Sequence, residues 1–272
     1  MNSNLIGPFS RDEVEIALKQ MAPLKAPGPH GMPPIFFQKF WNAIGDDVVK
    51  AVLSSLNSGT ILPGFNHTFI SLIPKVKTSK YVTEFHPIAF CNILYKPVSK
   101  VLANILKKVL PHIISESQSA FQLDKAISDN ILVAFELLHH MKRKKTRKIG
   151  HMALKLDMSK AYNRLEWTFL QRIMQKMGFH SRWVGWIMEC IRSVTYSVLT
   201  NGEPKDHIAL TRGIHQGDPL PLTSFFYVQK VWMVSLSKQC MVSILRAFLF
   251  ASMAQIYLTY FFVDDSLLFF RA

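Results

Sequence analysis

Apolar positions recur at helical spacing in several parts of the chain. Ser10 and Glu13 have the spacing of a capping box before an apolar stretch, which predicts a short helix over 11–21. Over 95–109, apolar residues three and four positions apart alternate with lysines, so this segment predicts an amphipathic helix. Helical spacing also predicts helices over 34–57, 126–141, 164–177 and 181–194.

Shorter apolar runs with β-branched and aromatic residues predict strands between these helices. The run 68–78 predicts a strand that Pro74 breaks before a basic loop, and 151–158 predicts another strand. Residues 196–213 predict a hairpin around an Asn-Gly-Glu-Pro turn. The stretch 260–270, YFFVDDSLLFF, predicts a second hairpin with a polar Asp-Asp-Ser tip. Helices mixed with antiparallel strands predict an α+β fold.

Two loops are rich in glycine and proline. The loop 23–34, PLKAPGPHGMPP, excludes regular structure and is expected to be rigid and exposed, carrying Lys25. The loop that begins GIHQGDP at Gly213 precedes a helix whose start is pushed toward 222 by two prolines. Its small residues let the backbone approach a nucleotide or base pair closely, and Gln216 offers an amide for hydrogen bonding.

The charge of the chain points to a polyanionic partner. The 272 residues are 49% hydrophobic, enough for one large domain or two smaller ones. Lys and Arg number 32 against 18 Asp and Glu, a net charge of +14 that suits nucleic acid, an anionic membrane or an acidic protein. A basic protein without such a partner is the alternative. The run Lys142–Lys148 is favoured as a solvated loop over a specific site, although it can contact phosphates non-specifically.

Several classes of protein are disfavoured. The three cysteines are far apart, and no Cys or His spacing suggests a disulfide framework or a structural zinc site. The polar stretch after Met1 has no secretory signal pattern. Residues 241–263 carry a single charge, Arg246, and the 17 uncharged residues after it approach the ~17–25 of a membrane span. Polar residues such as Gln255 within the segment and the Asp-Asp pair after it favour a buried core segment instead.

Asp264 and Asp265 lie side by side in a run that is otherwise suited to burial. An exposed turn alone would explain them, because Asp and Ser are common turn formers. However, Asp157 ends another apolar strand, and three carboxylates at the ends of neighbouring strands repel one another unless divalent cations lie between them. Two such ions about 3.5–4 Å apart activate a hydroxyl and stabilise a leaving phosphate, which is nucleotidyl-transfer chemistry. An aromatic at Tyr162, beneath the sugar, would favour a deoxynucleotide.

Blocks spread along most of the chain resemble, in order, the reverse transcriptase of non-LTR (LINE-type) retrotransposons, its plant branch in particular. The blocks are KAPGPHG, LIPKVK, FHPIAFCNILYKPVSKVLANILKKVLPHIISESQSAF, DNILVAFE, LKLDMSKAYNRLEW, GIHQGDPL and FVDDSLLFF. The resemblance implies the fingers and palm of a right-hand polymerase, with a ferredoxin-like palm of antiparallel sheet and packed helices. It implies fingers and fingers/palm over 1–150 and a palm with the catalytic aspartates over 151–272.

The resemblance also implies roles for individual residues. Three positions match catalytic, metal-binding aspartates for Mg²⁺ or Mn²⁺: Asp157, Asp264 and Asp265. Tyr162 resembles the sugar-gate aromatic, and Gln216 and Gly217 resemble the loop beside nucleotide and template. Nucleic-acid contacts are expected from Lys25, Lys75, Lys77, Lys96, Lys142, Arg143, Lys144 and Lys145. The implied partners are an RNA template, a DNA primer and dNTPs, without an organic cofactor, in a nuclear or cytoplasmic location.

The chain departs from the family pattern at several places. The family usually has Asp at His30, Arg at His86 and Asp at Asn163. An imidazole at 86 cannot make the permanently charged, bidentate contact of a guanidinium. Segment 238–260 is far more apolar than in the family, as a frameshifted join would be. The chain also ends at Ala272, soon after the paired aspartates and without a thumb, so we predict weak or no processive synthesis.

The sequence leaves three interpretations of function. The first is an RNA-directed DNA polymerase domain that uses two Mg²⁺ ions. The second is a catalytically inactive, nucleic-acid-binding retrotransposon remnant in which basic fingers hold RNA and the carboxylates are relics. A membrane-associated protein, supported by residues 241–263 alone, is the third. Metal-dependent affinity for dNTPs would fit the first interpretation and not the second.

Overall fold

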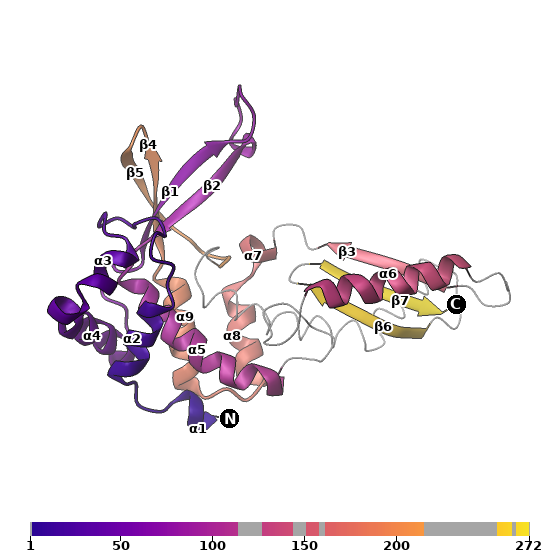
Figure 1. The fold of residues 1–272 in the computed structure, drawn as a ribbon, viewed down its shortest axis with the longest axis horizontal. Coiled ribbons are helices and arrows are strands. Elements are labelled where there is room, and N and C mark those ends of the chain that lie inside the picture. The colour runs from indigo at the N-terminus through magenta and orange to yellow at the C-terminus, as the bar shows by residue number, and fades with distance from the viewer. Residues whose placement is uncertain are drawn as a thin grey trace. The chain divides into compact units, whose positions relative to one another are not determined.

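The computed structural model describes residues 2–113, 127–143, 151–157, 161–214, 255–262 and 265–271 (Figure 1). The chain forms two compact units. One unit comprises Met1–Val109 and Tyr162–Ser224, and the other comprises Leu110–Ala161 and Phe225–Ala272. These units are not divided at residue 150, because the chain leaves the first unit after Val109 and returns to it at Tyr162. The assignment of fingers to 1–150 and palm to 151–272 stays a prediction.

The helices of the first unit follow the apolar periodicity of the sequence. Their bounds are α1 (Asn2–Leu5), α2 (Arg11–Lys19), α3 (Pro34–Lys39), α4 (Trp41–Ser58), α5 (Tyr95–Ile113, within this unit to Val109), α7 (Ala161–Arg164), α8 (Trp167–Lys176) and α9 (Ser181–Arg192). The predicted capping box begins α2: the backbone N–H of Glu13 donates to Ser10 Oγ at 3.3 Å, and that of Ser10 donates to Glu13 Oε2 at 3.1 Å. The helix predicted over 34–57 is interrupted at Phe40, between α3 and α4.

The core of the first unit is built around α5 and α9. The predicted apolar face of α5 is buried: Val98, Val101, Leu102, Ile105, Leu106 and Val109 are each 8% exposed or less. Trp183 on α9 and Tyr95 at the start of α5 are among the largest fully buried side chains. Burial of apolar surface, at about 25 cal/mol per Å², is therefore the main stabilising contribution to this unit.

A four-stranded sheet in the order β2-β1-β4-β5 belongs to the first unit. Its strands are β1 (His67–Pro74), β2 (Phe85–Cys91), β4 (Thr195–Thr200) and β5 (Glu203–Ala209). The pairs β1–β2 and β4–β5 are antiparallel hairpins, whereas β1 and β4 are parallel. Asn66 fixes the start of the parallel pair. Its side-chain Nδ2 donates to Cys190 O at 2.8 Å, and its backbone carbonyl accepts from Thr195 N at 3.1 Å. Figure 1 shows both hairpins standing away from the helices.

The hairpin predicted around Asn-Gly-Glu-Pro is confirmed. Asn201 and Gly202 have φ values of 53° and 85°, as a two-residue turn of type I′ requires, and β4 and β5 pair on either side. The strand predicted over 68–78 is also confirmed, and it ends at Pro74 as expected.

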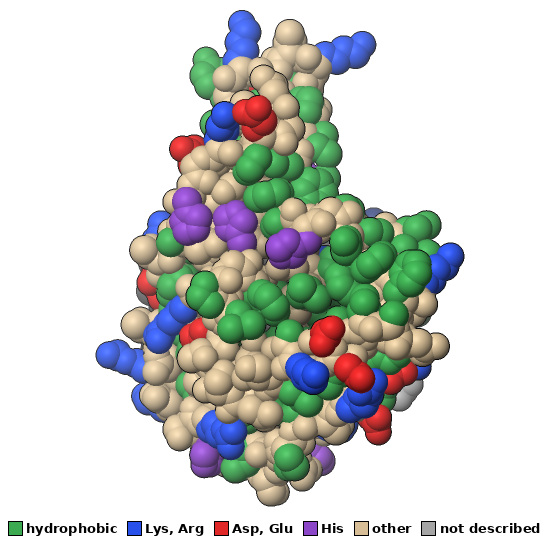
Figure 2. Space-filling model, turned by 90° about the vertical axis from the view of Figure 1, so that its left-hand side faces the viewer, with side chains coloured by type: hydrophobic (Ala, Val, Ile, Leu, Met, Phe, Trp, Pro, Cys, Tyr) green, Lys and Arg blue, Asp and Glu red, His purple; other side chains and the backbone are tan. Residues whose placement is uncertain are grey.

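A polar network joins β1, β4 and β5 at the base of the sheet. Ser197 Oγ donates to Asp206 O at 2.6 Å, so it accepts from His67 Nε2 at 3.2 Å. The other ring nitrogen, His67 Nδ1, bonds to Thr195 Oγ1 at 2.8 Å, and the ring stacks on His207 with centroids 5.5 Å apart. Burial, with the nearby charge of His207, lowers the pKa of His67. Figure 2 shows histidine side chains (purple) grouped in this region.

The second unit contains α6 (Ile127–Arg143) and an antiparallel sheet in the order β3-β7-β6. Its strands are β3 (His151–Asp157), β6 (Gln255–Phe262) and β7 (Asp265–Arg271). The predicted hairpin of 260–270 is confirmed in β6 and β7. Its tip is shorter than predicted, because Asp265 and Ser266 pair with residues of both neighbouring strands and so belong to β7. Only 263–264 separate the two strands, and these residues lie outside the described part of the chain.

The described elements give a mixed α+β fold with sheets and packed helices, as predicted. Within the apolar segment 241–263, residues 255–262 form strand β6, and 241–254 lie outside the described residues. Among the helices that the structure describes, none combines the length and the apolar character needed to cross a membrane.

Candidate active site and nucleic-acid interface

Two of the three predicted aspartate positions meet at one end of the three-stranded sheet. Asp157 is the last residue of β3 and is the direct register partner of Asp265, the first residue of β7. On its other side Asp265 pairs with Phe262 of β6. Cα atoms of direct partners in an antiparallel ladder are about 4.5–5.5 Å apart. Asp264 lies outside the described residues, but it precedes Asp265 directly in the sequence. The backbone therefore brings two acidic positions together that are far apart in sequence.

The chemistry of these positions fits a hard divalent cation. Neighbouring carboxylates repel each other unless a cation or a proton lies between them, and Mg²⁺ and Mn²⁺ prefer such oxygen ligands. Elsewhere, in the part of the chain whose side chains are described, no group of three or more His, Cys, Asp or Glu residues is placed to hold a metal ion. The end of the β3–β7 ladder is the candidate metal centre because Asp157 and Asp265 are direct register partners there.

The start of the GIHQGDP loop is fastened to the segment that follows Tyr162. The backbone N–H of Gly213 donates to Leu165 O at 2.7 Å, and its carbonyl accepts from Trp167 Nε1 at 2.6 Å. Gly213 has φ 82°, and a Cβ there would lie 2.9 Å from Asn163 O. Sequence analysis expected glycine to admit a ligand in this loop. At Gly213 the missing side chain leaves room for the backbone of Asn163, and the expected approach of a nucleotide stays a prediction.

The remaining residues of this predicted nucleotide site are only partly described. Tyr162 lies in α7 by its backbone, whereas Gln216 and Gly217 lie outside the described residues. The contact at Gly213 thus joins the start of the block that holds Gln216 to the block that holds Tyr162.

A second glycine joins two other blocks. In the loop 23–34 the N–H of Gly31 donates to Gly28 O at 2.9 Å, which closes a turn over Pro29 and His30. A Cβ on Gly28 would lie 2.5 Å from Cys91 O, so this loop rests directly on the end of β2. The loop is otherwise open to solvent, and Lys25 is exposed in it as predicted.

The predicted phosphate contacts differ in their exposure. Lys75 and Lys77 are exposed in the connection between β1 and β2. Lys96 is buried, with 4% of its surface exposed. The amphipathic pattern of 95–109 predicts its lysines on the face opposite the apolar one, and for Lys96 this is wrong, because the first turn of α5 enters the core beside the buried Tyr95. Lys142 and Arg143 are exposed in the last turn of α6, and Lys144 and Lys145 lie outside the described residues.

Sequence analysis missed a cluster of lysines around Lys25. Burial lowers the pKa of Lys100 on α5, and the charges of Lys107 and Lys25 lower it further. The positive charges of Lys107 and Lys25 therefore both act on Lys100. The helical spacing of Lys100 and Lys107, seven residues apart on the same helix, was the available signal. Helical periodicity does not reveal that Lys25, in the loop 23–34, lies near this helix.

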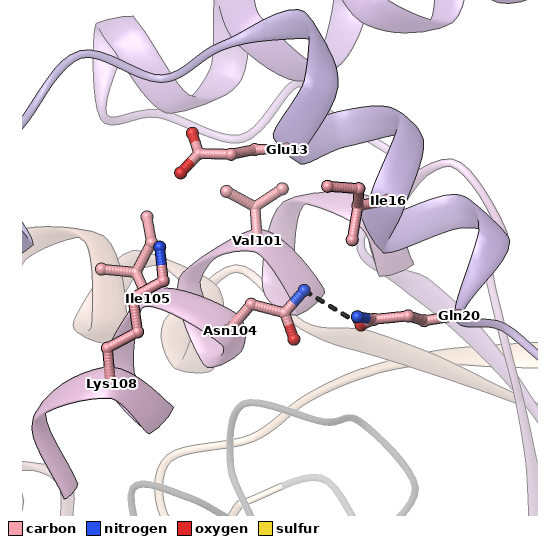
Figure 3. Close-up of a pocket in the computed structure, with 7 residues that line it drawn as sticks. All are labelled: Glu13, Ile16, Gln20, Val101, Asn104, Ile105 and Lys108. Carbon is pink, nitrogen blue, oxygen red and sulfur yellow. Dashed lines mark hydrogen bonds between the residues drawn. The ribbon is translucent and has the colours of Figure 1, made fainter.

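A separate depression lies between α2 and α5 (Figure 3). It has a volume of about 290 Å³ and is lined by Glu13, Ile16, Gln20, Val101, Asn104, Ile105 and Lys108. Asn104 Nδ2 donates to Gln20 Oε1 across it at 3.0 Å. No predicted site residue lines this depression, and the carboxylate of Glu13 in its lining already caps α2.

Opposed aspartate positions at the end of an antiparallel sheet, in a strongly basic chain, are typical of polymerases that join nucleotides with divalent metal. Residues 73–272 match the family of reverse transcriptases (RNA-dependent DNA polymerases), and the chain belongs to this family. The resemblance drawn from the sequence blocks is confirmed at this level.

Similar proteins come from mobile elements. The chain is 29% identical over 213 residues to the transposon TX1 uncharacterized 149 kDa protein of Xenopus laevis, covering 78% of this chain and 16% of that protein. It is 22% identical over 209 residues to the retrovirus-related Pol polyprotein from type-2 retrotransposable element R2DM of Drosophila melanogaster, covering 76% and 19%. It is 21% identical over 225 residues to the corresponding polyprotein from type-1 retrotransposable element R2 of Popillia japonica, covering 78% and 29%.

The chain therefore spans less than a third of each of these three relatives. It is a reverse transcriptase domain of the non-LTR retrotransposon kind. The placement in the plant branch and the partial degeneracy stay predictions.

Proposed function

We propose that this chain catalyses RNA-directed DNA synthesis, adding deoxynucleotides to the 3′-hydroxyl of a DNA primer on an RNA template. The main support is the register of β3 and β7, which sets Asp157 opposite Asp265 within the stretch that matches the family. A two-metal reaction needs carboxylates at a fixed, short separation. A hydrogen-bonded ladder fixes the backbone separation of Asp157 and Asp265.

The three aspartates share one part in the proposed reaction, which is to bind metal. Asp157, Asp264 and Asp265 would hold two divalent cations, Mg²⁺ or Mn²⁺. When bound, these ions activate the primer hydroxyl and neutralise the charge on the leaving pyrophosphate. The protein contributes the ladder that orients its carboxylates, and the palm that we assign to 151–272 supports that ladder.

Other residues position the substrates. Tyr162 packs beneath the sugar and disfavours a 2′-hydroxyl, while Gln216 and Gly217 lie beside the nucleotide and template. The contact of Gly213 with Leu165 supports this arrangement, because it holds the start of the Gln216 block against the Tyr162 block. Phosphates are held by basic residues of the fingers, which we assign to 1–150: Lys25, Lys75, Lys77, Lys142, Arg143, Lys144 and Lys145, together with Lys100 and Lys107.

The test is incorporation of a single nucleotide on a primed RNA template with Mg²⁺ or Mn²⁺. One addition needs the metal centre and does not need processivity. Asp264→Asn and Asp265→Asn are expected to reduce incorporation to background, because an amide keeps the shape of the side chain and removes its charge. Asp47→Asn, at an exposed carboxylate on α4, is the matched control and should retain incorporation.

The second candidate is a nucleic-acid-binding remnant without catalysis. His86 favours it, since this exposed residue of β2 stands where the family usually has a guanidinium. A folded chain that binds RNA but incorporates no nucleotide, and whose dNTP affinity does not depend on metal, would support the remnant and contradict the polymerase.

A further inference from the structure

Helix α6 of the second unit (Figure 1) carries apolar side chains on two opposite sides. On one side they are half-buried: Val133, Ala134, Leu137 and Met141. On the other side four large apolar side chains are between 47% and 65% exposed: Ile131, Leu132, Phe135 and Leu138. Their spacing of three and four residues places these four side by side, and we call them the α6 face. A helix that is apolar all round is normally buried all round, so the α6 face lacks a cover.

An aromatic pair lies at the middle of the α6 face. The ring of Phe135 stacks on that of His139, with centroids 6.2 Å apart and planes 8° from parallel. Aliphatic side chains flank Phe135 on the same face. A central aromatic anchor surrounded by apolar contacts is the arrangement that carries most of the energy of protein interfaces.

The charges beside the α6 face are complementary to their own reverse order. Asp129, Glu136 and Arg143 are exposed and follow one another at intervals of seven, so they lie along one edge of the helix. The first turn carries the acid and the last turn the base. When a second copy packs antiparallel, this edge meets the same edge running the other way. Asp129 then lies opposite the second copy's Arg143, twice by symmetry, and Glu136 lies opposite itself at the two-fold axis.

We propose that the α6 face pairs antiparallel with the α6 face of a second copy of this chain. The two Phe135 rings meet at the centre, and an Asp129–Arg143 ion pair closes each end. Antiparallel helices also align their dipoles favourably. An anionic membrane fits less well, because the edge with Asp129 and Glu136 would face lipid of the same charge.

The size of the α6 face sets the strength of the expected dimer. The helix has 17 residues and is therefore about 25 Å long. One pair of such helices buries less surface than a standard stable interface, so association should be weak and dependent on protein concentration.

The first test is sedimentation equilibrium of the full chain without nucleic acid, nucleotide or metal. The dimer therefore does not depend on the proposed function, and Arg143, which is also proposed to hold phosphate, is not occupied by a ligand. Phe135→Ala should weaken self-association about 30-fold, the effect of losing one interface hot spot. Phe169→Ala, at an aromatic on α8 that is 44% exposed, is the matched control and should leave self-association unchanged.

The second test uses charge reversal and identifies the partner as a second copy. Arg143→Glu and Asp129→Lys should each weaken self-association about 3- to 10-fold, because each places like charges at both ends of the dimer. An equimolar mixture of these two variants should associate as well as the unaltered chain, since opposite charges then meet at both ends. Glu136→Gln should strengthen self-association about 2-fold, because it removes the like charges at the axis.

Four results would overturn the inference. The first is a chain that stays monomeric at every concentration tested. The second is a mixture of the two charge variants that associates no better than either variant alone. A Phe135→Ala chain that loses unfolding stability as a monomer would show that another part of the same chain covers the α6 face. A Phe135→Ala chain that loses binding to anionic phospholipid vesicles while self-association persists would show a membrane contact instead.

Discussion

Replacing Gly213 with alanine should loosen the contact between the GIHQGDP loop and the segment after Tyr162. Gly213 has φ 82°, a conformation that costs an L-residue about 1–2 kcal/mol. The new Cβ would also lie 2.9 Å from Asn163 O and 3.1 Å from Asn163 Cα, and overpacking of this kind costs about 1–3 kcal/mol. The expected loss of unfolding free energy is therefore roughly 2–5 kcal/mol.

Gly64 provides the matched control for this change. Its φ is 80°, almost the same as that of Gly213, and a Cβ there would meet nothing within 4 Å. Gly64→Ala thus reports the backbone cost alone, and the difference between the two variants in urea unfolding reports the clash with Asn163. Gly213→Ala should also lose more single-nucleotide incorporation than Gly64→Ala, measured where each variant is fully folded. If the two variants are equally stable and equally active, the contact does not support the site.

Three further changes test other parts of the structure. Burial lowers the pKa of His67 in the folded protein. The stability that its neutral ring supplies is therefore complete above the unfolded pKa of about 6.5 and is lost as pH falls through the lower folded value. Urea unfolding between pH 8 and pH 5 should show this fall in stability, and His67→Gln should flatten it. Lys100→Gln should reduce the salt dependence of single-strand RNA binding by about 0.7 without loss of stability, since it relieves repulsion from Lys25 and Lys107; an unchanged slope would exclude Lys100 from the interface. Tyr162→Ala should raise the use of rNTPs relative to dNTPs in single-nucleotide incorporation, and unchanged selectivity would contradict the sugar-gate role.

Local signals in the sequence were sufficient for most elements of the fold. The capping box at Ser10 and the Asn201-Gly202 turn are determined by residues within a few positions of each other, and the structure has both where they were predicted. The parallel pairing of β1 with β4 was not predictable in this way. It depends on Asn66, which bonds to the end of α9 through Cys190 O, a contact between residues far apart in the chain. The burial of Lys96 has the same origin, since the side of a helix that faces the core is set partly by what packs against its first turn.

The candidate site was likewise predictable from the sequence only in part. Sequence analysis selected the acidic positions from their place at the ends of apolar strands, and the register of Asp157 with Asp265 agrees with that choice. It did not find the two close backbone approaches, of Gly28 to Cys91 and of Gly213 to Asn163. In each case a glycine is needed because another segment's backbone occupies the space of a side chain, and no periodicity in either segment reveals the other. Both approaches join blocks that resemble the reverse transcriptase pattern. The glycines of those blocks therefore contribute by setting the spacing between functional segments, and substitutions at them should impair the reaction even where no nucleotide contacts the glycine itself.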